Sequence, residues 1–407
     1  MLNKTHSRRL ISVAFAVFVG LGIAQSVLGV AWPSIKTDLS RPLADLGVLL
    51  AIGTGGYFLA GLAAGPLMKR FGTGRLLVAT MALGTVSLVS YGVAQAWLFL
   101  LMSSVGLGFT SGLVDAVVNS YVALNHGTRT MNLLHASFGV GATTGPVLVT
   151  TVLARGLSWR WTYLILAAVE AALLVTVFMV RKGWPEGPQE TVPGTGVSRV
   201  NGSVAGLLAL FFLNVGFEVT AGQWAYSALT EGRGVTEFVA GIWVALYWGG
   251  LTGGRLLLGV IGDKISGRTV LHLSMSGAIV GAALFWWNPA GWGLLGLPLM
   301  GASVAGVFPT LVALTPSWVG ERRAPVVIGY QVAAASAGTA VVPWIAARFV
   351  DSTGLESLGP FLVVVAVLMA ALNFVVDRHA HGGFHLRLTQ SRSSFSRTTS
   401  DRNSSQS

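Results

Sequence analysis

Cysteine is absent from the sequence, and charged residues are rare. With no cysteine among 407 residues, the chain can form no disulfide bond, thiolate nucleophile or cysteine metal site. Charged residues make up 10% of the chain, whereas a soluble protein has about 25%. Hydrophobic residues make up 53%, so the polar surface is too small to cover a soluble globule. These values exclude a soluble enzyme and a disulfide-stapled secreted domain, and they predict a polytopic membrane protein.

Acidic residues are scarcer than basic ones: 15 Asp and Glu against 26 Lys and Arg give a net charge of +11. With both termini placed inside, 19 basic residues fall in cytoplasmic segments and 6 in outer loops, while Arg255 lies within a span. Positive residues accumulate on the cytoplasmic side of membrane proteins. This distribution explains the net charge, so we expect no nucleic-acid partner and expect both termini in the cytoplasm.

Long hydrophobic runs dominate the rest of the chain. About 20 apolar residues are needed to cross roughly 30 Å of hydrocarbon, and twelve runs reach that length. We therefore expect an all-α polytopic membrane protein with spans at 10–32, 46–67, 76–94, 97–122, 131–153, 161–180, 203–228, 238–258, 269–287, 291–316, 326–347 and 357–376. Asn288-Pro289 marks the break inside an uncharged stretch that is too long for one helix.

A polar, Pro- and Gly-rich connection at 181–202 divides the spans into six and six. We interpret it as a cytoplasmic linker between an N-terminal half at 10–180 and a C-terminal half at 203–376. Residues 1–9 form the predicted cytoplasmic N-terminus. Residues 377–407 are Ser- and Arg-rich without apolar periodicity, which predicts a disordered cytoplasmic tail.

The two halves repeat each other. Gly65-x-x-x-Lys69-Arg70 follows the second span, and Gly259-x-x-x-Asp263-Lys264 follows the eighth. A Pro also recurs in spans 5 and 11, within Gly145-Pro146 and Val342-Pro343. Because both pairs recur at nearly the same offset, a duplication in parallel orientation is indicated.

The repeated loop resembles the signature of the major facilitator superfamily, approximately G-x-L-x-D-R-x-G-R-R. The second copy matches well, whereas the first has Lys69 in place of the acid. The resemblance implies twelve helices in two pseudo-symmetric six-helix halves. It also implies roles in the gating loops for Gly65, Arg70, Gly72, Gly259, Asp263, Lys264 and Arg268. We add Arg255, which lies near Asp263 in the sequence, to this predicted gating group.

Three stretches resemble the fucose-permease-like group and the fungal bypass-of-stop-codon proteins: GLVDAVVNSYVALNHGTRTMNLLHASFGVGATTGPVL, FFLNVGFEVTAGQWAYSAL and GYQVAAASAGTAVVP. The resemblance implies a proton-coupled sugar permease with carboxylates in spans 1 and 4. The span 4 acid maps to Asp115, whereas span 1 has no acid and its most polar residue is Gln25. Part of an antiporter signature is present as Gly141-x-x-x-Gly145-Pro146, so the direction of transport stays open.

Three acids fall at membrane depth: Asp115, Glu170 and Glu218. Charges there are expensive and indicate function, and no basic residue lies in the middle of those spans. Asp115 is the first proton-coupling candidate, because Ser111 and Asn119 share its helical face. The alternative is a structural hydrogen bond from a protonated Asp115. Glu170 lies in a span that is peripheral in this architecture, which favours helix packing.

Glu218 is the second proton-coupling candidate. Asn214 lies one turn before it, and Trp224 follows toward the outside, so the group could hold a polyol or an amphipathic cation. A purely structural role for these residues is the alternative. The remaining candidate substrate-binding residues are polar groups within other spans: Gln25, Asn119, Asn132, His135 and Gln331.

Together these features predict a secondary active transporter of a small polar, sugar-like solute, driven by proton symport through alternating access. Proton-antiport efflux of drugs or metabolites is the alternative within the class, and a non-transporting membrane receptor is the alternative outside it. We expect no enzymatic activity, cofactor or metal. The expected partners are the solute, protons and the lipid bilayer. We expect a monomer in the plasma membrane, with a bacterial inner membrane favoured by composition.

Overall fold

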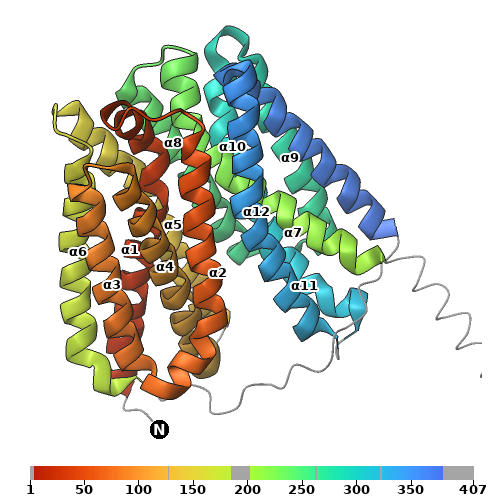
Figure 1. Cartoon of the computed structure of the whole chain (residues 1–407). Coiled ribbons are helices and arrows are strands. Elements are labelled where there is room, and N and C mark those ends of the chain that lie inside the picture. The colour runs from red at the N-terminus through yellow and green to blue at the C-terminus, as the bar shows by residue number, and fades with distance from the viewer. Residues whose placement is uncertain (1–3, 127, 185–201, 262–263, 321–322, 379–407) are drawn as a thin grey trace, which may run out of the picture.

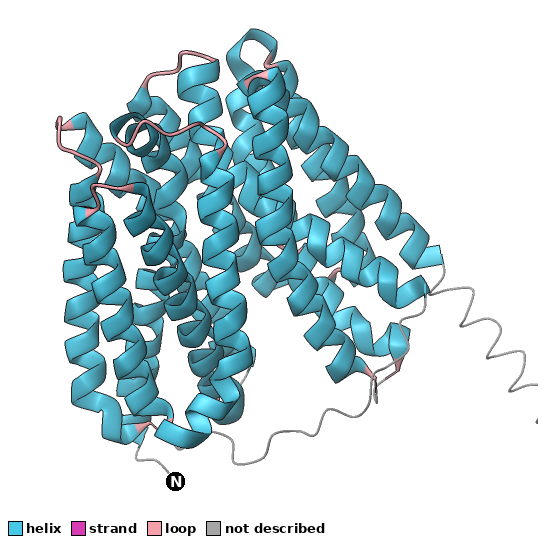
Figure 2. Cartoon of the chain, viewed as in Figure 1, coloured by secondary structure: helices cyan, strands magenta, loops and turns pink. Residues whose placement is uncertain are grey.

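The computed structural model describes residues 4–126, 128–184, 202–261, 264–320 and 323–378. Most of the predicted linker at 181–202 and nearly all of the predicted tail at 377–407 lie outside these ranges, as does Asp263. In the described ranges every regular element is helical (Figure 2).

The first half contains six long helices. They are α1 (Lys4–Asp38), α2 (Asp45–Phe71), α3 (Thr73–Val93), α4 (Trp97–Asn125), α5 (Thr128–Ala154) and α6 (Arg160–Val180). The second half begins with α7 (Gly202–Ser227), which a π-helical turn extends through Ala228–Gly232. It continues with α8 (Glu237–Ile261), α9 (Gly267–Trp287), α10 (Gly296–Val304), α11 (Val307–Val319) and α12 (Ala324–Thr353).

The described residues include twelve helical segments that are long and apolar enough to cross a membrane. The last of them is Leu355–Arg378, and α10 and α11 belong to a single span, Gly291–Val319. The helix of this span is interrupted at Ala305 and Gly306. Pro309 explains the interruption, because proline has no backbone N–H to donate and its ring clashes with the carbonyl group of the residue four positions earlier. The prediction of an all-α, twelve-span protein is confirmed.

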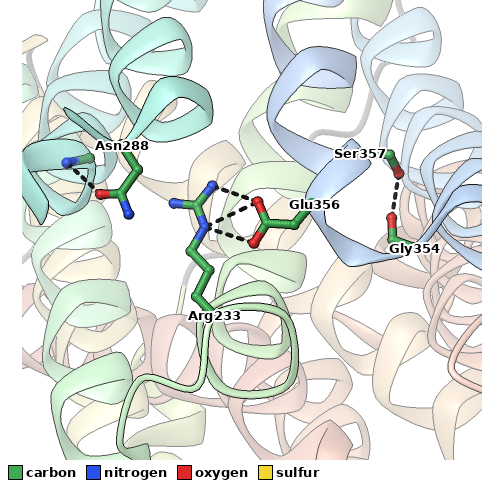
Figure 3. Close-up of polar contacts among 6 residues, drawn as sticks. Arg233, Asn288, Gly354, Glu356 and Ser357 are labelled. Atoms are coloured by element: carbon green, nitrogen blue, oxygen red, sulfur yellow. Dashed lines mark hydrogen bonds and ion pairs between the residues drawn. The ribbon is translucent and has the colours of Figure 1, made fainter. Parts of the chain in front are cut away.

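Short connections between the helices follow from local backbone chemistry. Gly72 alone joins α2 to α3 with a φ of 76°, a conformation that glycine adopts without a steric penalty. Asn288 ends α9 in the left-handed region with a φ of 46°. Its side-chain oxygen accepts a hydrogen bond from the Gly293 amide at 3.0 Å (Figure 3). The predicted break at Asn288-Pro289 is therefore confirmed.

Each half uses the same pairing of spans. The first span packs on the fifth and the second on the fourth, as α1 with α5 and α2 with α4. In the second half the corresponding pairs are α7 with α12 and α8 with α10. At these interfaces glycines meet the backbone of the neighbouring helix, for example Gly141 against Val19 and Gly338 against Phe212. Small residues of this kind let membrane helices approach closely.

The two halves touch each other toward one end of the bundle. Their contacts run through α1 with α7, α2 with α12 and α5 with α8. Near the ends of α1 and α7, Lys36 pairs with Glu231 at 2.9 Å. Deeper in, the Gln223 amide donates to the Gln25 carbonyl at 2.9 Å. The helices converge at this upper end in Figure 1 and diverge at the lower end, where the N-terminus lies.

Within the second half, an ion pair joins two segments at the converging end. Arg233 follows the π-turn of α7 and donates to Glu356, with Nη2–Oε2 at 3.1 Å and Nε–Oε1 at 3.2 Å (Figure 3). The guanidinium also lies 4.5 Å from the Phe285 ring centroid. These contacts join the loop after α7 to the start of the last span and to α9.

We predict that Gly29→Ala loosens the contact between α1 and α7. A methyl group there would lie 2.7 Å from the Gln223 Cα atom, and overpacking of this kind costs about 1–3 kcal/mol. Ser227→Cys supplies a single thiol at a buried position near the converging end, because the chain has no cysteine of its own. In intact cells an impermeant maleimide should label this thiol several-fold faster when Gly29→Ala is also present.

Gly253→Ala is the matched control, because nothing lies within 4 Å of a Cβ atom at that position. It should leave the labelling rate unchanged. Equal labelling rates with Gly29→Ala and without it would contradict a steric role for Gly29 in holding the two halves together.

Candidate functional site

Asp115 of α4 is held by two hydrogen bonds. The Tyr57 hydroxyl of α2 donates to its Oδ2 atom at 2.7 Å, and the Asn119 amide donates to its Oδ1 atom at 2.9 Å. Gly112 makes the first contact possible, because a Cβ atom there would lie 2.6 Å from the Tyr57 carbonyl oxygen. The predicted shared face of Asp115 and Asn119 is confirmed. The two donors leave both carboxylate oxygens hydrogen-bonded at membrane depth.

His135 of α5 faces the same group. Its side chain is exposed, and its ring meets the Phe18 ring edge-on with centroids 6.0 Å apart. His135 interacts electrostatically with Asp115 and with Arg255. Asn132 lies one turn away on α5, and nothing is described of its side chain.

Glu218 of α7 has a basic partner, which corrects the expectation of an unneutralised acid. Arg255 of α8 places its Nη2 atom 3.6 Å from the Glu218 Oε1 atom, with side chains 23% and 13% exposed respectively. The distance is that of an ion pair and is too long for a good hydrogen bond. Arg255, which we expected in the cytoplasmic gate, therefore lies beside the central acid. The Tyr247 hydroxyl donates to the Glu218 backbone carbonyl at 2.7 Å.

Four ionisable groups follow one another across the boundary between the two halves. Asp115 and His135 belong to the first half, and Arg255 and Glu218 to the second. Asp115 with His135 and Glu218 with Arg255 are acid–base pairs, whereas His135 and Arg255, which interact across the boundary, are both basic. Such a set can exchange a proton and can also offer acceptors and donors to hydroxyl groups.

Other predicted solute-binding residues are buried inside the packed helices. Asn214 is 1% exposed and Trp224 is fully buried, and their side-chain nitrogen and oxygen atoms have no hydrogen-bond partner in the structure. Gln331 is also fully buried and donates to the Thr315 Oγ1 atom at 2.7 Å, joining α12 to α11. The Gln25 side chain, by contrast, is exposed. For all four, contact with a solute stays a prediction.

Apart from Arg255, the predicted gating residues that the structure describes lie at the diverging end. Arg70 and Lys264 are exposed there, and Arg268 pairs with Asp377 at 3.0 Å. Cβ atoms on Gly65 and Gly259 would meet nothing within 4 Å, so neither glycine mediates a close helix contact in this arrangement. The gating roles of these residues, and of Gly72 and Asp263, stay predictions.

Tyr57, Tyr247 and Gln223 were missed by the sequence analysis. Each is a polar group in the interior of an apolar span, and that position is the only available signal. Nothing in the pattern indicates which neighbouring helix such a side chain meets. Within the described ranges, His, Asp and Glu form no group of three that could hold a metal ion.

Comparison with known proteins decides the family. The family model described as Major Facilitator Superfamily matches residues 14–224 and again 206–398, once for each half. The chain belongs to the Major Facilitator Superfamily. Several of its relatives are named as transporters, and the expectation that it is not an enzyme is confirmed.

Several relatives are similar over most of their length. The chain is 25% identical over 380 residues to the glucose/mannose transporter GlcP of Bacillus subtilis, covering 87% of this chain and 92% of that protein. It is 24% identical to the sodium-dependent glucose transporter 1A of Mus musculus, covering 75% and 80%. It is 22% identical to bypass of stop codon protein 6 of Saccharomyces cerevisiae, covering 88% and 80%. The resemblance to the fucose-permease-like group is thereby supported.

The arrangement of helices also matches solved structures. A bacterial homologue of the human lysosomal transporter Spinster, in an inward-facing and occupied conformation, superposes with a TM-score of 0.76 at 14% identity. The match covers 93% of this chain and 98% of that one. At this identity the likeness establishes the fold.

We predict that Arg255→Gln destabilises the protein because it leaves the Glu218 carboxylate without a cation. Leaving a buried polar group unsatisfied costs about 1–3 kcal/mol, and more for a charge. The melting temperature of the purified protein in detergent should fall in Arg255→Gln and recover in part in the double variant with Glu218→Gln. Additive losses in the two single variants would show that the two side chains are not coupled.

Proposed function

We propose that the protein is a secondary active transporter of a small, sugar-like solute, coupled to protons and working by alternating access. The observation that carries this proposal is the position of Asp115: a carboxyl group at membrane depth, beside the boundary between the halves and interacting with His135. Membership of the Major Facilitator Superfamily and the glucose transporters among the relatives support it.

A carboxyl group in this setting is suited to carry a proton. The charged form accepts from Tyr57 and Asn119 on its two oxygens. The protonated form would become a donor itself, so the hydrogen bond at one oxygen must rearrange. Protonation therefore changes the contacts between α2 and α4. A group whose charge alters helix contacts in this way can bias one arrangement of the halves over the other.

The same residues suit a solute rich in hydroxyl groups. Asp115 and Glu218 supply acceptors, while Asn119 and Arg255 supply donors, and each of these two sets has one residue from each half. Hydroxyl groups both donate and accept, so a sugar can satisfy both kinds of partner. Such a site discriminates strongly against analogues that lack a hydroxyl, because its polar groups would then lack partners.

The arrangement of the halves supports alternating access. The halves are in contact at the end that carries loops 39–44 and 233–236 and diverge at the end near α2–α3 and the N-terminus. The distribution of basic residues favours a cytoplasmic location for the diverging end, and on this basis the proposed arrangement is inward-open in the plasma membrane. Both halves belong to one chain, so a monomer suffices for the cycle.

We predict that Asp115→Asn abolishes solute accumulation against a gradient while exchange of solute persists. The amide keeps the size of the carboxyl group but cannot take up a proton. The measurement is uptake of a labelled hexose into proteoliposomes under an imposed pH gradient, compared with counterflow in the absence of a gradient. Tyr57→Phe is the matched variant: it removes one hydrogen bond to Asp115 and should weaken accumulation without abolishing it.

Three results would each contradict a different part of the proposal: the coupling residue, the coupling ion or the direction of transport. Accumulation by Asp115→Asn equal to that of the wild type would remove Asp115 from coupling. Accumulation driven by an imposed sodium gradient and not by a pH gradient would replace the proton by sodium, which is the ion named for several relatives. Hexose export under an inward proton gradient would favour antiport.

A further inference from the structure

A pocket lies inside the first half, away from the boundary between the halves. It lies among α1, α3, α4 and α6, and eleven residues line it. Three of these carry polar side chains: Thr110 and Ser111 of α4 and Glu170 of α6. Glu170 stands at the middle of α6, and Ser111 is one turn from Asp115 on α4.

Two glycines make room for the Glu170 carboxyl group. Its Oε1 atom lies 3.1 Å from the point where a Cβ atom on Gly84 of α3 would sit. Its Oε2 atom lies 3.7 Å from the corresponding point at Gly20 of α1. The carboxyl group therefore projects inward between two helices. In the described part of the chain it has no hydrogen-bond or ion-pair partner, so the helix-packing role expected from the sequence is not supported by a polar contact.

The polar groups nearby favour a carboxylic acid over a carboxylate. The Thr110 hydroxyl donates to the Thr80 carbonyl at 3.3 Å, so the Thr110 oxygen retains lone pairs that can accept a proton donor. That oxygen lies 3.5 Å from the same Gly84 Cβ point that the Glu170 Oε1 atom approaches. A bare carboxylate in such a pocket would be expensive. An alkali cation would need a shell of oxygens, and most of the lining is apolar.

Other titratable groups on the surrounding helices face elsewhere. Helix α1 has none between Arg9 and Lys36. Tyr91 of α3 and Tyr163 of α6 stack on each other with centroids 4.3 Å apart, two turns from Gly84 and Glu170 toward the outer side. The rest lie nearer the cytoplasmic or the outer end, or at the central site: Arg75, Asp115, Tyr121, His126, His135, Arg155, Arg160 and Arg181.

We propose that Glu170 is a second proton-binding site of the transport cycle, located inside the first half. It is coupled to Asp115 through α4, which carries both Asp115 and the pocket residue Ser111. Glu170 binds its proton among α1, α3, α4 and α6, while Asp115 binds one at the central site. Because Ser111 lines the pocket and lies one turn from Asp115, a shift of α4 that follows protonation of Asp115 also changes the pocket wall. The role in the cycle rests on the proposed proton coupling, whereas the binding of a proton does not.

The first experiment measures the proton directly. Infrared spectra of the full-length Asp115→Asn variant, whose central site cannot bind a proton, are recorded in nanodiscs at neutral pH. They should contain the C=O stretch of a protonated carboxylic acid, which a carboxylate lacks. The substitutions that follow are made in this variant. Glu170→Gln should remove this band. Glu237→Gln is the matched control, because Glu237 is exposed at the start of α8, and it should leave the band unchanged. A band that survives in Glu170→Gln overturns the proposal, as does a band that disappears when sodium is added.

The second experiment measures the role in transport. The gradient of labelled hexose that balances an imposed pH gradient gives the number of protons moved per solute. Glu170→Gln should still accumulate solute but should move fewer protons per solute than the wild type. An unchanged ratio would overturn the role in the cycle. Loss of the infrared band in Glu170→Gln together with intact accumulation by Asp115→Asn would refute the central coupling site and leave proton binding at Glu170 standing.

Discussion

Close approach of helix backbones inside a medium of low dielectric is the constraint on which this structure depends. In a bilayer the hydrophobic effect does not drive helices together, so packing of small residues does much of that work. Gly112 brings α4 against α2, and this approach puts the Tyr57 hydroxyl within 2.7 Å of Asp115. The same contacts that hold each half together therefore determine which polar side chains can meet.

The three membrane acids show how strongly the surroundings differ at similar depth. Asp115 accepts from two neutral donors, Glu218 has the Arg255 cation beside it, and Glu170 lies in a pocket without a described partner. An ion pair stabilises the charged form, whereas an apolar pocket favours the neutral one. The same carboxyl group thus meets three different surroundings, which the neighbouring helices determine.

Close glycine contacts occur both inside each half and at the boundary between the halves, where Gly29 meets the Gln223 backbone. Pairs within a half, such as α1 with α5, rest on contact between glycine and backbone. Across the boundary, the outer rim depends on an ion pair between partly exposed side chains, Lys36 and Glu231. Pairs of this kind contribute about 1 kcal/mol or less. The proposed alternating access requires each half to move as a unit while these boundary contacts open.

The sequence by itself determined the twelve spans, the internal duplication and the three acids, because hydrophobic length and isolated charge are local properties that a bilayer imposes on any chain. It also predicted that Asp115 and Asn119 share a face, since helical periodicity suffices for that. Only the tertiary structure decided that Arg255 neutralises Glu218, that Tyr57 donates to Asp115, and that Asn214 and Trp224 are buried. Those contacts depend on which helices become neighbours and how each is rotated about its axis. Packing across the whole bundle sets both, and no single segment encodes them.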